Sequence, residues 1–265
     1  MAILFNRRET QLECENIART QQGLANGDES FNFKNLTINL NDVSCLLPKC
    51  YADSIGFYFN ALISFTNGLY SIKHKNYSWA SVQLYYSIYY GCRAKLGFDK
   101  IAIIRKKGLF SLEISPNSVS QKLKDQNDHK MTINCYKRKY ELSDFLLSNK
   151  INNVDFYDWI TDIREITHYR QRSFQEPNYL GLFNLIVEEL KNGKTLFTLL
   201  EEYSQNWNLF CFQEETAIIA GPYKLLFEVA QFYKNQPLRL DLQQRNFIKR
   251  ALKKANCEKL FSNFI

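Results

Sequence analysis

Arg164 and His168 are the two residues of this 265-residue chain whose types and spacing best suit chemistry. Both lie in the segment DWITDIREITHYRQRSFQEP, where apolar periodicity predicts a helix from Phe156 to about Arg172. Side chains four positions apart lie one turn apart on a helix, so both can face one cleft or one partner. A histidine can move a proton near neutral pH, and a guanidinium can stabilise phosphate charge. The pair would suit RNA cleavage without a metal.

A structural reading of the same pair is also open. Arg164 would then pair with a nearby acid and His168 would bond to a neighbouring helix. The residues that follow, Tyr169, Arg170 and Arg172, would form a polar surface that contacts a partner or nucleic acid.

The elements that position this segment are predicted to be helices. Residues Ile55, Phe59, Leu62, Phe65, Leu69 and Ile72 recur at spacings of three and four, which predicts a long helix from Tyr51. Ser78 is expected to cap a second helix with an aromatic stripe through Trp79, Val82, Tyr86, Tyr89 and Leu96. Because their connection is short, the two helices should pack antiparallel, as in a bundle.

A small β-hairpin is predicted between the helices. Ile101–Arg105 and Leu109–Ile114 are apolar runs separated by Lys106, Lys107 and Gly108. A polar helix should begin near Asn117 or Ser118, and Asn153 or Asp155 should cap the helix of Arg164. The fold class is therefore mainly α: an antiparallel helical bundle with a β-hairpin insertion and a C-terminal helical extension.

Three segments are expected along the chain. Residues 1–50 form an irregular N-terminal segment with a short strand at Phe31–Leu40, residues 51–178 form the bundle, and residues 179–265 form the extension. Helices are expected in the extension at 180–197, 212–233 and 240–255, and the extension should pack on the same core.

Common catalytic and cofactor motifs are missing from the sequence. It has no GxGxxG, Walker A, GxSxG or HExxH motif and no paired CxxC, which argues against the usual nucleotide, hydrolase and zinc sites. With only three histidines, a metal site is not expected, and neither is a cofactor. The seven scattered cysteines are interpreted as reduced core thiols.

At this point the chain resembles the HEPN superfamily of small helical bundles. The helix WASVQLYYSIYYGCRAKL (79–96) and a later helix with an Arg and a His near its end carry the resemblance, which covers roughly residues 50–175. The family occurs in prokaryotic toxins, antiphage systems and RNA-processing proteins. In its catalytic members, dimerisation joins two motifs in which an arginine precedes a histidine by about four to six intervening residues.

Here only Glu165, Ile166 and Thr167 lie between Arg164 and His168. One residue fewer rotates the histidine by about 100° on a helix. The resemblance therefore implies a non-catalytic interaction or scaffold subunit of an antiphage or toxin-related assembly, with protein subunits as partners. The alternative is a metal-independent ribonuclease that uses Arg164 and His168 across a homodimer.

A third hypothesis concerns the C-terminal helix, which would bind RNA or DNA. Its apolar face carries Phe247, Ile248, Ala251, Leu252 and Ala255, and its other faces carry Arg245, Lys249, Arg250, Lys253 and Lys254. The net charge of +7 is compatible with a polyanionic partner. No signal peptide or membrane span is predicted, so a cytoplasmic location without membrane contact is expected.

Overall fold

The fold is described from a computed structural model that covers residues 7–124, 127–170, 172–174, 176 and 181–261. Contacts divide the chain into two compact units, and neither is one continuous stretch of sequence. Unit 1 comprises residues 1–57, 92–138 and 236–238, and unit 2 comprises residues 58–91, 139–235 and 239–265.

The protein is mainly helical, with 63% of it in helices and a small antiparallel sheet, as predicted. The helices of the first half are α1 (Glu9–Gln21), α2 (Leu40–Lys73), α3 (Tyr77–Phe98) and α4 (Asp128–Lys139). Those of the second half are α5 (Phe156–Glu165), α6 (Asn184–Lys191), α7 (Leu196–Gln205), α8 (Trp207–Phe210), α9 (Glu214–Lys234) and α10 (Leu242–Lys254). Short helical turns lie at η1 (Phe145–Leu147) and η2 (Ile166–Arg170).

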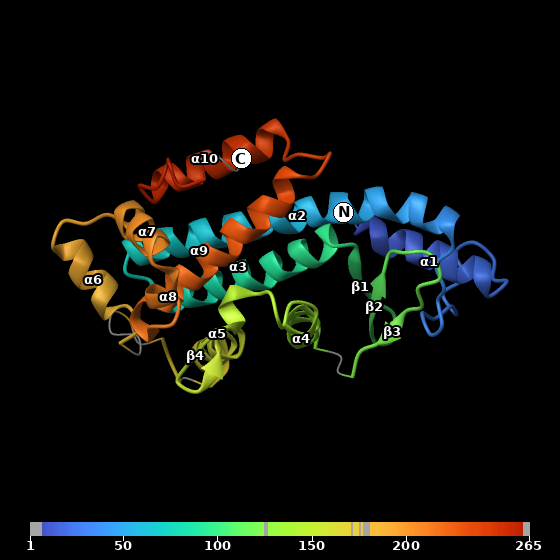
Figure 1. The fold of residues 1–265 in the computed structure, drawn as a ribbon, viewed down its shortest axis with the longest axis horizontal. Coiled ribbons are helices and arrows are strands. Elements are labelled where there is room, and N and C mark those ends of the chain that lie inside the picture. The colour runs from blue at the N-terminus through green and yellow to red at the C-terminus, as the bar shows by residue number, and fades with distance from the viewer. Residues whose placement is uncertain (1–6, 125–126, 171, 175, 177–180, 262–265) are drawn as a thin grey trace. The chain divides into compact units, whose positions relative to one another are not determined.

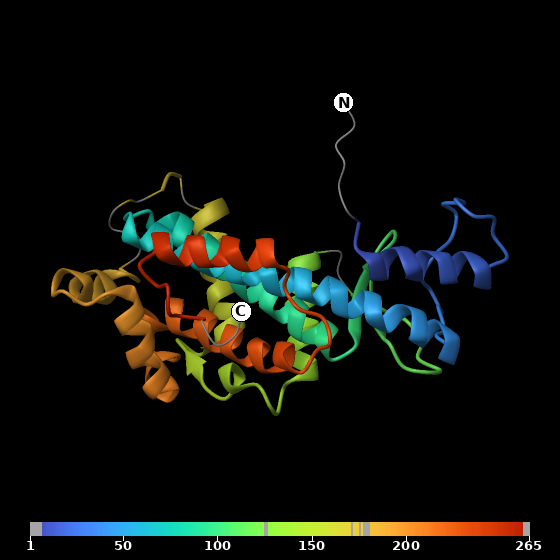
Figure 2. The same ribbon diagram turned by 90° about the horizontal axis from the view of Figure 1, so that it is seen from above.

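Helices α2 and α3 run side by side in both ribbon views (Figure 1 and Figure 2). Glycines of both helices allow close approach: a Cβ atom at Gly68 would meet Leu84 in unit 2, and one at Gly97 would meet Ser54 in unit 1. Residue 54, early in α2, thus lies against residue 97, late in α3, and residue 68, late in α2, lies against residue 84, earlier in α3. The two helices are therefore antiparallel.

Unit 1 packs α1 and the ends of α2 and α3 around a three-stranded sheet. Strands β1 (Ile101–Arg105) and β2 (Leu109–Glu113) form the predicted hairpin, with Arg105 opposite Leu109, and β3 (Gln121–Lys122) pairs with β2. Buried side chains of the loop before α2, including Phe31, Phe33 and Leu36, share one core with Phe110 and Leu112 of β2.

Unit 2 has a core rich in aromatic side chains from α2, α5 and α9. Tyr58 packs on Tyr233 with ring centroids 5.0 Å apart, and Phe65 stacks on Tyr223 at 6.0 Å. Gly221 of α9 faces the ring of Phe156 at the start of α5. A minor hairpin of β4 (Lys150–Ile151) and β5 (Val154–Asp155) leads directly into α5.

The N-terminal fifty residues are more regular than expected. Helix α1 was not predicted, and the strand predicted at Phe31–Leu40 is wrong, since only Thr37 forms an isolated bridge there, with Val119. The first predicted helix begins at Leu40 instead of Tyr51 and contains Pro48. Its first residues bury Leu46 and Cys50 in the core of unit 1, which accounts for the earlier start.

Further boundaries of predicted elements also shift. The helix expected from Asn117 or Ser118 begins at Asp128, and the one expected at 180–197 is split into α6 and α7 around Gly193. The helices expected at 212–233 and 240–255 correspond closely to α9 and α10. The two units do not follow the three predicted segments, because both draw on α2 and α3.

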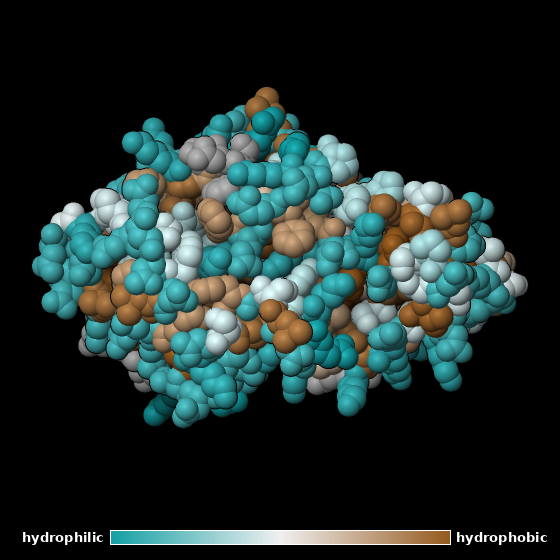
Figure 3. Space-filling view, in the orientation of Figure 1, coloured by the Kyte–Doolittle hydropathy of each residue, from teal (hydrophilic) through white to brown (hydrophobic). Residues whose placement is uncertain are grey.

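On the face drawn in Figure 3, hydrophilic side chains predominate and hydrophobic ones form small groups between them. Within the described part of the chain, no helix is long and apolar enough to cross a membrane.

Candidate functional site

Helix α5 holds the segment that contains Arg164. As predicted, Asp155 caps its start, because the carboxylate accepts hydrogen bonds from the amides of Tyr157 and Asp158 at 2.9 and 3.1 Å. Of the predicted buried stripe, Phe156, Trp159, Ile160, Ile163 and Thr167 are buried, whereas Ile166 is only half-buried. Tyr157, which the stripe did not include, is buried as well. These buried side chains anchor α5 in the core of unit 2, and Arg164 and His168 lie beside them.

The predicted helix does not continue as an α-helix to Arg172. It ends at Glu165 and passes into the π-helical turn η2. A π turn aligns residues five positions apart instead of four, and such turns often occur at functional sites. Two contacts have this spacing: Arg164 donates to the Tyr169 hydroxyl at 3.1 Å, and Arg170 pairs with Glu165 at 3.0 Å.

Arg164 is half-buried between aromatic rings. The guanidinium carbon lies 5.3 Å from the ring centroid of Tyr85 and 4.8 Å from that of Tyr169, both within cation–π range. Its Nε is buried without a hydrogen-bond partner among the described residues. Tyrosine rings, and not the acid expected in the structural reading, therefore hold this side chain.

His168 is exposed and does not join Arg164. Its ring packs edge-on against Trp79 at 5.9 Å and against Tyr169 at 5.2 Å. No hydrogen bond or ion pair links it to any residue that the structure describes. Tyr169, which sequence reasoning assigned to a contact surface, occupies the position next to Arg164 that the histidine was expected to take.

An exposed group of aromatic side chains surrounds this turn. Trp79 is 47% exposed, Tyr169 67% and Phe174 49%, and the rings of Trp79 and Phe174 meet at 5.9 Å. His168 lies against the same tryptophan, and Arg170 and Arg172 of the same segment are exposed. We call these six residues the Trp79 surface. It lies entirely within unit 2.

Glu176 ties the loop of this surface to the start of α3. Its carboxylate accepts the amides of Tyr77 and Ser78 at 3.1 and 2.6 Å. The cap predicted from Ser78 itself is therefore wrong: the helix begins at Tyr77, two residues before the start that a cap at Ser78 implies, and a distant glutamate caps it. Burial and then this carboxylate raise the pKa of Tyr77.

Sequence reasoning missed part of this surface. Trp79 was assigned to an aromatic stripe, of which Val82, Tyr89 and Leu96 are buried while Tyr86 is half-buried. Phe174 was not singled out at all. The density of aromatic and arginine residues at 168–174 was the only available signal.

Helix α10 presents the predicted basic face. Ile248, Leu252 and Ala255 are buried, whereas Lys249, Arg250, Lys253 and Lys254 are exposed, and Arg245 is half-buried. Phe247 departs from the prediction, since it is 48% exposed. None of the five basic residues has an ion pair within the ranges described, so their charge is open to a polyanion.

Metal-ligand chemistry finds no support in the described residues, where no three His, Cys, Asp or Glu side chains gather as a metal site would require. None of the seven cysteines, all of which lie in the described ranges, forms a disulfide, and all but Cys45 are buried.

Comparison with known proteins returned no match to a family model, a curated protein or a solved structure. The resemblance to the HEPN superfamily therefore rests on the sequence pattern of residues 50–175.

Proposed function

We propose that the chain is a non-catalytic interaction subunit that binds a protein partner through the Trp79 surface. Tryptophan, tyrosine, phenylalanine and arginine are the residue types enriched in protein interfaces, and large aromatic side chains supply most binding hot spots. The observation that carries the proposal is the exposure of Trp79, Tyr169 and Phe174 together on one unit.

The environment of Arg164 supports a non-catalytic role. A transition-state phosphate would need a guanidinium that can turn towards it, and this one is already in contact with the rings of Tyr85 and Tyr169. His168 points at Trp79 instead of sharing a hydrogen bond with Arg164. The assembly itself, antiphage or toxin-related, is inferred from the HEPN resemblance.

Copurification with the products of neighbouring genes tests the proposal. The tagged chain is expected to retain one such product in a fixed molar ratio through size-exclusion chromatography. Trp79→Ala should lower the retained fraction strongly, because truncating a hot-spot aromatic costs on the order of 2 kcal/mol of binding free energy, or about thirtyfold in affinity.

The matched control is Arg138→Gln, an exposed arginine of unit 1 that lies outside the surface. It should copurify as the wild type does. A chain that elutes alone, or equal retention by Trp79→Ala and wild type, would contradict the proposal. A symmetric self-complex lost in Trp79→Ala would instead identify a homodimer as the assembly.

Helix α10 favours a second candidate function, the binding of RNA or DNA. Its exposed cations have no ion pair within the described ranges, which leaves them available to phosphates. Binding of a labelled oligonucleotide should then weaken steeply with added salt, and Lys249→Gln with Arg250→Gln should flatten the slope by about two counterions. A salt-independent affinity would exclude this candidate.

A further inference from the structure

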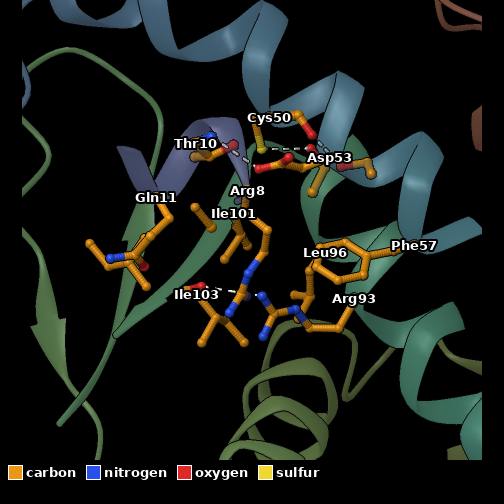
Figure 4. A pocket seen from close by; sticks show the side chains of 14 residues that line it. Arg8, Thr10, Gln11, Cys50, Asp53, Phe57, Arg93, Leu96, Ile101 and Ile103 are labelled. Carbon is orange, nitrogen blue, oxygen red and sulfur yellow. Dashed lines mark hydrogen bonds between the residues drawn. The ribbon is translucent and has the colours of Figure 1, made fainter. Parts of the chain in front are cut away.

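A pocket in unit 1 combines charge, a buried hydroxyl and an apolar wall. It lies between the start of α1, the middle of α2, the end of α3 and strand β1, and its cavity volume is about 20 Å³. Figure 4 shows Arg8 and Arg93 entering it from two different elements, next to Phe57.

The two guanidinium groups converge. The guanidinium carbon of Arg93 lies 4.7 Å from the ring centroid of Phe57, and that of Arg8 lies 6.0 Å from the same centroid. Arg93 has a side chain only 3% exposed and also donates to the carbonyl of Ile103 at 3.2 Å. Two like charges held this close favour an anion between them.

The carboxylates near the pocket are already engaged. Asp53 accepts the amides of Glu9 and Thr10, both at 3.0 Å, and so caps α1. Asp128 pairs with Arg93 at 3.0 Å and accepts a hydrogen bond from Thr132.

The charge around Asp128 is dominated by arginines. Burial raises the pKa of Asp128, but Arg93, Arg8, the Thr132 hydroxyl and Arg105 together lower it below its ordinary value. Three guanidinium groups thus act on this one carboxylate, while Asp53 adds a second negative charge to the pocket lining.

Thr10 supplies an unused polar group. The residue is 5% exposed and lines the pocket, and its hydroxyl has no hydrogen-bond partner among the described residues, although it stands beside the Cys50 thiol. A buried hydroxyl without a good partner is costly unless a ligand or water satisfies it.

We propose that this pocket binds a phosphate-class oxyanion between Arg8 and Arg93, with the Thr10 hydroxyl as an additional donor. Guanidinium groups match the geometry of phosphate oxygens, and the Phe57 ring keeps both groups in position. The anion is either inorganic phosphate or the terminal phosphate of a larger molecule whose remainder stays outside. This site is independent of the Trp79 surface and of the proposed function.

Calorimetric titration of the full chain with inorganic phosphate at constant ionic strength tests the site. The wild type should bind in a one-to-one ratio. Arg8→Gln should weaken binding at least about tenfold, because a hydrogen bond to a charged group contributes that much or more. Thr10→Val should weaken it severalfold, and Arg138→Gln, which removes an exposed charge of the same unit, should leave it unchanged.

A parallel titration with AMP separates the two sources of the anion. Tighter binding than inorganic phosphate would identify a larger ligand anchored by its phosphate, and equal or weaker binding would identify the free ion. Circular dichroism checks that each variant is folded. If Arg8→Gln does not fold, Thr10→Val still tests the site. No heat with wild type, or equal loss in Arg8→Gln and Arg138→Gln, would overturn the proposal.

Discussion

The π turn at Ile166–Arg170 determines which side chain stands next to the Arg164 guanidinium. A continuous α-helix would bring His168 onto the same edge as Arg164, whereas the wider turn brings Tyr169 there. The guanidinium therefore stabilises a local aromatic contact, which explains how an arginine can be half-buried here without an acid.

Replacing Arg164 should measure that contact. Arg164→Ala is expected to lower the free energy of unfolding by about 1–2 kcal/mol, because two cation–π contacts are lost. Tyr169→Phe keeps the ring and loses only the hydroxyl bond, so it should cost about 1 kcal/mol or less. Urea unfolding of the three proteins gives the values, and a larger loss in Tyr169→Phe than in Arg164→Ala would refute this order.

RNA cleavage provides a second test at the residue scale. If His168 is part of the Trp79 surface and does not transfer protons, the purified wild-type chain should leave RNA intact in the presence of EDTA. The His168→Ala variant should also leave RNA intact. Cleavage by the wild type that yields 2′,3′-cyclic phosphate ends and disappears in His168→Ala would establish the ribonuclease alternative instead.

Close helix packing decides stability at the scale of elements. A Cβ atom at Gly221 of α9 would lie 2.1 Å from the Phe156 ring, whereas one at Gly56 of α2 meets nothing within 4 Å. Gly221→Ala should therefore destabilise unit 2 by about 1–3 kcal/mol through overpacking. Gly56→Ala should stabilise the protein by about 0.5–1 kcal/mol, since alanine favours helices.

Thermal unfolding of the two glycine variants checks this prediction. The signs should be opposite, although both changes add the same methyl group within a helix. Loss of stability in both variants would show that backbone conformation, and not the Phe156 contact, controls the effect.

Helical periodicity was enough to predict most elements, because the buried faces of α2 and α5 repeat at helical spacing. The π turn at Ile166–Arg170 was not predictable in this way, since it changes the period within one helix. Trp79 was misplaced because Tyr77, Ser78 and Ala80 form the buried side of the first turn of α3, which leaves Trp79 on its exposed side. The cap by Glu176 depends on a contact 98 residues away, which no local pattern contains.

On the scale of the whole molecule, two units share α2 and α3. Each unit is assembled from distant stretches of sequence, so a reading along the chain could not separate them. The pocket of unit 1 was missed for the same reason, because Arg8, Asp53 and Arg93 come together only after folding.

Acid should weaken unit 1 through Asp128. The folded-state pKa of this carboxyl lies below 3.8, so its ion pair with Arg93 is stabilising above the unfolded pKa and is lost as the pH falls through the folded one. The stability difference between wild type and Asp128→Asn should therefore shrink from about pH 6 to about pH 3. Urea midpoints of both proteins at each pH give this difference, and a constant value would contradict the assignment.

The affinity of the chain for its copurified partner tests the central claim most directly. Titration of that partner with wild type, Trp79→Ala and Arg138→Gln should show a dissociation constant raised about thirtyfold by the first variant and unchanged by the second. Identical dissociation constants for all three proteins, with Trp79→Ala fully folded, would contradict the claim that the Trp79 surface is where this protein acts.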